Sequence, residues 1–130
     1  LAMAGVPVPP GVLDGENIEP LLRQSGSMKR DAIYWHYPHY HICGATPYGA
    51  IREGDFRLVE FYEDNHVELY NLKDDIGETK DLAATLPEKT AALRQKLHDW
   101  RQSVDAQMPT PNPNYDPNVT PEKGRKKAKQ

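Results

Sequence analysis

The segment of residues 56–72 constrains the fold more than any other part of the sequence. Its two halves, one ending at Glu63 and one starting at His66, are rich in aromatic and branched apolar side chains, which β-strands favour. Asp64 and Asn65 stand between the halves, and both residue types tolerate the positive φ of a two-residue hairpin turn. The sequence therefore predicts a β-hairpin here.

A two-residue turn also predicts the register of this hairpin. The expected pairs are Tyr62 with Val67, Glu60 with Leu69, and Val59 with Tyr70. Side chains alternate between the faces of a strand, so one face carries Leu58, Tyr62, Val67 and Leu69, and the other carries Val59, Phe61, Tyr70 and Leu72. A sheet with one wet face would alternate more cleanly. Both faces are therefore expected to need cover.

Two further strands are expected upstream of the hairpin. Residues 31–37 are rich in aromatic and branched side chains, and Pro38 either ends this run or confines it to a sheet edge. Residues 48–52 form a shorter run. Gly54 follows it in a tight turn, because glycine accepts a positive φ without steric cost. These runs extend the predicted hairpin into a larger sheet.

One amphipathic helix is expected to cover one face of the sheet. Apolar residues recur at steps of three, four and seven, at Leu86, Leu93, Leu97, Trp100 and Val104. This spacing predicts a helix from about Leu86 to Val104. Thr85 and Glu88 are spaced as a capping box at its start, and Pro87 fits its first turn. The sequence shows no comparable helix for the other face, so the expected cover is a missing upstream part of the protein.

Five segments in this order resemble the C-terminal part of formylglycine-dependent sulfatases. Residues 13–22 resemble the stretch that leaves the catalytic domain of that family, and residues 50–58 resemble its R-x-G-D-W-K-L hairpin, with Phe56 for Trp and Arg57 for Lys. The other similar segments are residues 68–72 (E-L-Y-D-L), residues 74–83 (D-P-x-E-x-x-N-L-A, with Ile76 and Asp81 departing from it) and residues 88–100 (the final helix). The resemblance covers about residues 1–105.

The resemblance implies an α+β fold, in which a four-stranded antiparallel sheet packs against one C-terminal helix. It also implies three parts. Residues 1–30 would be a linker that leaves the absent catalytic domain, and residues 31–105 would be the sulfatase C-terminal subdomain. Residues 106–130 would be a Pro-rich and basic tail, extended or disordered. The expected partner is the N-terminal catalytic domain, which in this family belongs to the alkaline phosphatase superfamily.

The resemblance also implies where the chemistry lies. In such sulfatases a formylglycine, made from Cys or Ser within C-x-P-x-R, attacks sulfur while a divalent metal, usually calcium, neutralises the sulfate oxygens. Cys43 departs from that motif, because Pro47 comes two positions late and no arginine follows. Asp74 and Asp75 lie after the last strand, unlike the acidic metal-binding pair of the family. No catalytic residue, metal ligand or cofactor is expected in this chain. Calcium and formylglycine are expected in a parent enzyme that hydrolyses sulfate esters of carbohydrate, and the chain alone is expected to be inactive.

The run from Tyr34 to Gly44 holds three of the five histidines and three of the seven tyrosines. Imidazoles donate hydrogen bonds to hydroxyl or sulfate oxygens, and tyrosine rings stack on sugar rings. In similar sulfatases the corresponding strand and loop run toward the mouth of the active site. The residues expected to bind substrate are His36, His39 and His41, with Tyr37 and Tyr40 as stacking platforms. The alternative is that these histidines fill a domain interface.

Other interpretations remain for single residues. His39, His41 and Cys43 would share one face of an extended strand, and their types suit zinc, but the irregular loop favoured by Pro38 and Gly44 argues against a closed site. The remaining expectations concern ion pairs of Arg52 and Arg57 with Glu53, Asp55 or Glu60, solvent-facing His66 and His98, and a core position for Trp100.

Charge and hydropathy exclude other classes of function. The formal net charge is -3 and the body has no basic face, so no nucleic-acid partner is expected despite five basic residues among the last eight. No apolar run approaches the length of a membrane span. By resemblance, a periplasmic or extracellular location is expected, with its signal upstream. The alternative function is a stand-alone carbohydrate-binding or interaction module without catalysis.

Overall fold

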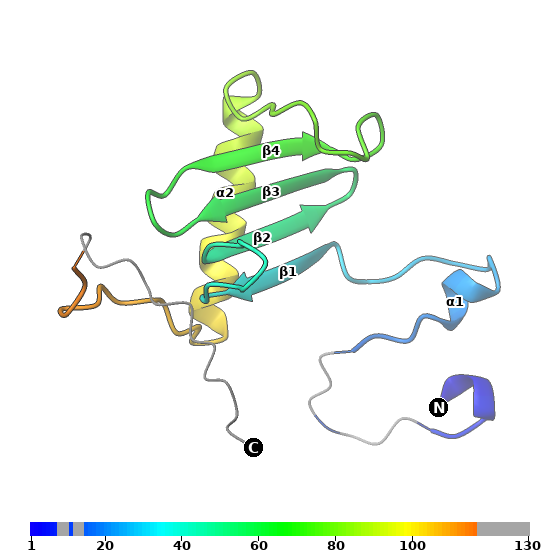
Figure 1. The fold of residues 1–130 in the computed structure, drawn as a ribbon. Helices are drawn as coiled ribbons and strands as arrows, with labels where there is room; N and C mark the ends of the chain where they lie inside the picture. The colour runs from blue at the N-terminus through cyan, green and yellow to red at the C-terminus, as the bar shows by residue number, and fades with distance from the viewer. Residues whose placement is uncertain (8–10, 12–14, 117–130) are drawn as a thin grey trace, which may run out of the picture.

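The fold is a four-stranded sheet with one long helix on one side of it (Figure 1). The computed structural model describes residues 1–7, 11 and 15–116. The strands are β1 (Ala32–Tyr37), β2 (Tyr48–Glu53), β3 (Phe56–Phe61) and β4 (Val67–Asn71), and the long helix is α2 (Pro87–Ser103). Two short helices, η1 (Ala2–Ala4) and α1 (Glu19–Leu22), lie in the lead-in before the sheet. This arrangement confirms the predicted α+β fold.

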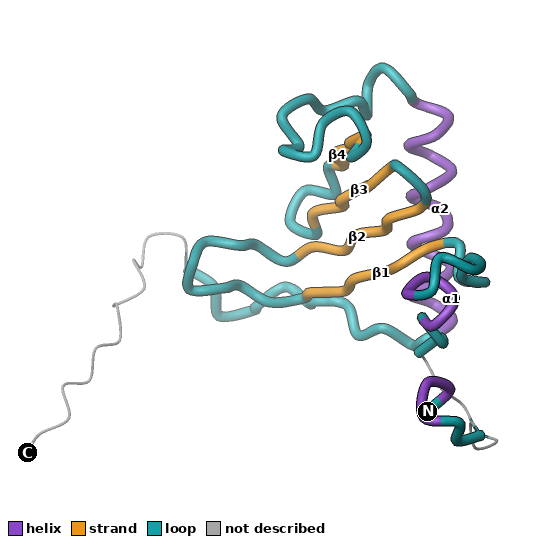
Figure 2. Tube along the Cα trace, turned by 90° about the vertical axis from the view of Figure 1, so that its right-hand side faces the viewer, coloured by secondary structure: helices purple, strands orange, loops and turns teal. Residues whose placement is uncertain are grey.

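The sheet is a simple meander. Its order is β1-β2-β3-β4, and every neighbouring pair is antiparallel. In Figure 2 the sheet is seen from its side, with α2 along one face and the loop between β1 and β2 projecting away from the helix. None of the helices in the described residues is both long and apolar enough to cross a membrane.

The hydrophobic core lies between the sheet and α2. The predicted helix stripe places Leu93 and Leu97 there, where they are 2% and 0% exposed. They pack on apolar side chains from all four strands, namely Ala32, Ile51, Leu58 and Leu69. Trp100 stacks on Tyr34, with ring centroids 4.9 Å apart and an interplanar angle of 9°. Full burial of a leucine side chain such as Leu93 or Leu97 contributes about 1.5–3 kcal/mol, so the apolar stripe explains why α2 packs on this face of the sheet.

The predicted register of the β3–β4 hairpin is wrong by two residues. Val67 pairs with Glu60, not with Tyr62, and the backbone N–H of Phe61 donates to His66. The backbone N–H of Tyr62 instead donates to the carbonyl of Pro47, 3.0 Å away in the β1–β2 loop. Tyr62 thus leaves the ladder and lengthens the turn. A shift of two keeps each side chain on its predicted face, whereas a shift of one would have reversed both faces.

The predicted capping box at the start of α2 is also wrong. Leu86 is the N-cap and makes no side-chain capping bond. The hydroxyl of Thr85 donates to the carbonyl of Leu82, 3.1 Å away, so it is not available to the first helical turn. Thr90 donates its own hydroxyl to the carbonyl of Leu86, which ties the first turn of α2 together from within.

The sheet face opposite α2 is only partly covered within the described residues. Val59 and Tyr70 are buried there, but Ile33 and Trp35 on β1 remain 45% and 41% exposed. We call this surface the open face. Its exposed half lies on β1, as expected for a two-sided sheet with a single covering helix.

Candidate substrate surface

Aromatic and imidazole rings gather where β1 ends and β2 begins. Tyr37 is the centre of this group, with ring centroids 5.6 Å from His39, 6.5 Å from His41 and 5.8 Å from Tyr48. His39 and His41 are exposed. Tyr37 lies on the open face, because it alternates with Trp35 and Ile33 along β1. Three of the five predicted site residues are therefore together.

Local hydrogen bonds shape the loop that carries His41. The N–H of Gly44 donates to the carbonyl of His41, and the N–H of His41 donates to the carbonyl of Ala45, both at 2.9 Å. The N–H of Cys43 donates to Nδ1 of His41 at 3.1 Å. Because Nδ1 is an acceptor, the neutral ring carries its proton on Nε2. His41 can therefore offer a hydrogen-bond donor to an anion.

Tyr40, the fourth predicted site residue, ties the loop to the β3–β4 turn. Its hydroxyl donates to Oε1 of Glu63 at 2.7 Å, and this hydrogen bond is the main cause that raises the pKa of the phenol. The side chain is 70% exposed. Tyr40 thus presents an open ring held at its tip, which suits a stacking platform.

His36, the fifth predicted site residue, lies on the other side of the sheet. It faces α2 and pairs across the strands with Gly49. Its Nδ1 lies 2.7 Å from the hydroxyl of Tyr62, and its Nε2 lies 2.9 Å from the carbonyl oxygen of Gln107. Both ring nitrogens are therefore engaged within the chain, and the structure does not bring His36 together with His39 and His41.

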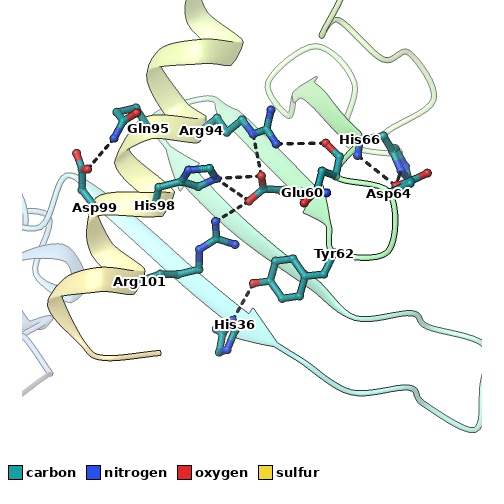
Figure 3. A network of polar contacts seen from close by, with 11 residues as sticks. His36, Glu60, Tyr62, Asp64, His66, Arg94, Gln95, His98, Asp99 and Arg101 are labelled. Carbon is teal, nitrogen blue, oxygen red and sulfur yellow. Dashed lines mark hydrogen bonds and ion pairs between the residues drawn. The ribbon is translucent and has the colours of Figure 1, made fainter. Parts of the chain in front are cut away.

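A buried carboxylate organises the contact between the sheet and α2 (Figure 3). The side chain of Glu60 is only 3% exposed, and it forms ion pairs with Arg94 at 2.7 Å and with Arg101 at 2.8 Å. Nε2 of His98 lies 2.9 Å from both oxygens. Burial alone would raise the pKa of Glu60. The hydrogen bonds from His98 and Arg94 outweigh burial, so the pKa lies below its usual value.

This network corrects the expected position of His98. His98 was predicted to face solvent and instead contacts Glu60. A signal for it exists in the sequence, because Arg94, His98 and Arg101 follow one another at steps of four and three beside the apolar stripe of α2. Basic side chains next to the buried stripe become partly buried when α2 packs on the sheet, and partly buried charges are favoured when they are paired. Their spacing therefore indicates a carboxylate on the sheet face under α2.

The half of the open face on β3 and β4 carries a second polar arrangement. Arg57 binds both oxygens of Glu78, at 2.5 and 2.6 Å, so it forms the expected ion pair but with an acid outside the expected set. Tyr70 lies nearby in a hollow of about 260 Å³. Burial and a hydrogen bond to Glu68 raise the pKa of Tyr70 to about 12, so this phenol stays neutral and acts as a donor.

The loop that carries Cys43 was considered above as a zinc site. Cys43 is exposed and unpaired with any other cysteine. Among residues 1–7, 11 and 15–116, no three His, Cys, Asp or Glu side chains lie close enough together to hold a metal ion. The zinc interpretation of His39, His41 and Cys43 therefore has no support in their geometry.

Comparisons with known proteins identify relatives of this chain. The family described as "N-sulphoglucosamine sulphohydrolase, C-terminal" matches residues 1–106. A sulfatase of Formosa agariphila is 35% identical over 100 residues, which are 68% of this chain and 18% of that protein. An N-acetylglucosamine-6-O-sulfatase of Bacteroides thetaiotaomicron is 34% identical over 110 residues, which are 78% of this chain and 19% of that protein.

Solved structures give the same result. One is described as in complex with its substrate D-glucosamine-2-N,6-O-disulfate. It superimposes with a TM-score of 0.63 and 30% identity over 80% of this chain and 22% of that one. This chain thus spans about a fifth of the length of the relatives it matches.

Proposed function

Since this chain belongs to the family of C-terminal domains of N-sulphoglucosamine sulphohydrolases, we propose that it is the C-terminal part of a sulfatase that hydrolyses sulfate esters of carbohydrate. In this proposal the chain supplies one rim of the substrate pocket and completes the fold of the parent enzyme. The nucleophile and the metal, expected to be a formylglycine and calcium, belong to the N-terminal catalytic domain. The parent enzyme is proposed to act in the periplasm or outside the cell.

The observation that carries the proposal is the ring cluster at the end of β1. The ring centroid of Tyr37 lies 5.6 Å from that of His39 and 6.5 Å from that of His41, and the neighbouring Tyr40 is exposed. Imidazole donors suit sulfate and hydroxyl oxygens, and phenol rings suit the apolar face of a sugar. His36 precedes Tyr37 in β1 and is bonded to Tyr62 and to the Gln107 carbonyl, so it is proposed to support the rim from the other face of the sheet. The relatives named as sulfatases of glucosamine derivatives suggest a sulfated glucosamine as substrate.

The open face supports the second part of the proposal. Trp35 and Ile33 expose large apolar surfaces side by side on the same face of β1, and such surfaces mark contacts with another protein segment. The matched part of this chain makes up only 18% and 19% of the two relatives, so most of each relative is available to cover these side chains. We propose that the catalytic domain packs there.

Substrate kinetics of the parent sulfatase test the rim. The probe is glucosamine-2-N,6-O-disulfate, and the variants are His39→Ala, His41→Ala and Tyr40→Ala. The two histidine variants are expected to raise KM by about tenfold with little change in kcat, since a hydrogen bond to a charged group contributes about 1.5–3 kcal/mol. Tyr40→Ala is expected to raise KM by a smaller factor, because it removes a stacking surface and not a hydrogen bond to the sulfate. Ile42→Ala is the matched control, because Ile42 lies in the same loop and is 99% exposed.

The outcomes separate the two candidate functions. An unchanged KM in all three variants would contradict a role in substrate binding. Binding of the probe by this chain alone, with the affinity of the parent enzyme, would instead favour an independent carbohydrate-binding module.

A further inference from the structure

We propose that residues 106–116, which follow α2, form a second wall of the substrate surface, and that His36 is the positioning residue that holds this wall in place. The proposal deepens the function proposed above and rests on it. It assigns a role to a segment that the sequence predicts only as an extended or disordered tail. It also explains why a histidine of the ring-rich run points to the opposite side of the sheet.

The hydrogen bonds of His36 fix the start of the segment. The carbonyl oxygen of Gln107 can only accept, so Nε2 of His36 must carry the proton it donates. In the neutral ring, Nδ1 then accepts from the hydroxyl of Tyr62. Because both edges of the ring are bonded, the imidazole cannot turn without breaking one of these contacts. The segment is therefore attached to β1 at His36, which precedes Tyr37 of the ring cluster and faces the opposite side of the sheet.

The support behind His36 is rigid. The Tyr62 ring passes so close to Gly49 that a Cβ at that position would lie 2.4 Å from the phenol oxygen. The guanidinium of Arg101 lies over the same ring, with Cζ 5.3 Å from its centroid, and is itself bound to Glu60. Tyr62 is thus clamped between the sheet and α2, and it transmits this fixed position to His36.

The composition of the segment makes it stiff. Pro109, Pro111 and Pro113 each fix φ near the polyproline value and favour an extended backbone. The last of these prolines lies in a turn. The N–H of Asn114 donates to the side-chain oxygen of Asn112 at 3.0 Å, and the N–H of Tyr115 donates to the Asn112 carbonyl at 3.1 Å. This turn presents Tyr115, whose side chain is 74% exposed.

The far end of the segment lies near the ring-bearing loop. In Figure 2 the chain after α2 extends toward the same side of the molecule as the β1–β2 loop. The pKa of Tyr40 is raised by the hydrogen bond from its hydroxyl to Glu63, by burial, by the charge of Glu63 and, least of all, by Tyr115. Two exposed tyrosines carried by separate segments can contact successive sugar rings of a sulfated oligosaccharide.

The test uses the parent sulfatase and two readouts. Hydrogen exchange of residues 107–116 reports whether the segment is held, and KM against kcat for a sulfated glucosamine oligosaccharide reports whether it contacts substrate. His36→Ala should speed exchange in the segment and raise KM roughly two- to tenfold with kcat unchanged. His36→Gln, whose amide can still donate to the Gln107 carbonyl, should restore much of both values.

Two further variants divide attachment from contact. Gln107→Ala keeps the backbone carbonyl and should change neither readout. Tyr115→Ala should raise KM without changing exchange at Gln107, and it decides the contact role even if His36→Ala folds poorly. Unchanged exchange in His36→Ala overturns the attachment, and an unchanged KM in Tyr115→Ala overturns the second wall. Failure of the proposed function would look different, because His39→Ala and Tyr40→Ala would then leave KM unchanged as well.

Discussion

Nη2 of Arg101 lies 2.8 Å from Oε2 of Glu60, and this contact joins α2 to β3 in the buried layer between helix and sheet. The Arg101 side chain is 11% exposed, and its Nη1 has no hydrogen-bond partner among the described residues. Glu60 is therefore the main compensation for a nearly buried guanidinium. Removing one partner of such a pair is costly, because the other charge stays buried.

Glu60→Ala should destabilise the docking of α2 by about 3–5 kcal/mol, since three basic side chains would lose their shared carboxylate. The measurement is the free energy of local opening from hydrogen exchange in α2 of the parent protein. Glu53→Ala is the matched control, because it removes a carboxylate from a more exposed pair with Lys96 and should cost at most about 1 kcal/mol. Equal effects of the two variants would contradict a special role for the buried network.

The same carboxylate predicts a pH dependence. The folded-state pKa of Glu60 lies below the ordinary value of 4.5 for a glutamate, so the folded state favours the ionised form. Its contribution to stability is complete above the unfolded pKa and is lost as the pH falls through the lowered folded pKa. Opening of α2 should therefore become easier below about pH 4.5, and Glu60→Gln should flatten this part of the profile. A Gln variant with the wild-type slope in this range would refute the assignment.

Gly49→Ala should be destabilising by about 1–3 kcal/mol, because the new methyl group would overlap the hydroxyl of Tyr62. In the background of Tyr62→Phe, which lacks that oxygen, the penalty should be smaller. A double-mutant cycle from thermal unfolding of the parent protein measures the difference. Additive effects would show that the close approach of Tyr62 to Gly49 does not govern this position.

Trp35→Asp should lower the melting temperature of the parent protein more than Ile42→Asp does. Ile42 is 99% exposed in this chain, so Ile42→Asp should be nearly neutral in the isolated chain and in the parent protein. Trp35 is 41% exposed, so Trp35→Asp already loses packing in the isolated chain, and the additional loss of stability in the parent protein is what reports docking. Only Trp35 lies on the open face, where the catalytic domain is proposed to pack. Equal, small effects in the parent protein would remove the support for docking at this face.

The sequence predicts the sheet and α2 well because hydrophobic periodicity reports burial directly. The stripe containing Leu93, Leu97 and Trp100 was sufficient to locate the helix and its buried side. The two faces of the hairpin were also predicted correctly, since an even shift of register preserves them. The local sequence pattern does not predict the strand register where a backbone N–H bonds to a residue in another part of the chain. The bond from Tyr62 to Pro47, far back in the sequence, decided the register.

The candidate site was harder to predict, because its histidines are chemically identical and differ only in whether they lie against α2 or are exposed in the β1–β2 loop. His39 and His41 stand two positions apart, whereas His36 precedes His39 by three, an odd step that would put it on the opposite face of a continuous strand. Because Pro38 interrupts the run, the sequence did not show whether this alternation continues from His36 to His39. The structure separates His36, which is bonded to Tyr62 and to a carbonyl 71 positions away. Such a contact depends on the path of the chain after α2, which proline content alone does not specify.

The meander order of the strands has a consequence for how this domain forms. Every strand pairs with its neighbour in the sequence, so each closure needs only a short loop and costs little chain entropy. The return of α2 to β1 closes a much longer stretch and should come last. Side chains such as Leu97 would then act mainly after the folding barrier. Trimming them should shorten the lifetime of the docked helix while leaving the rate at which the hairpins assemble nearly unchanged.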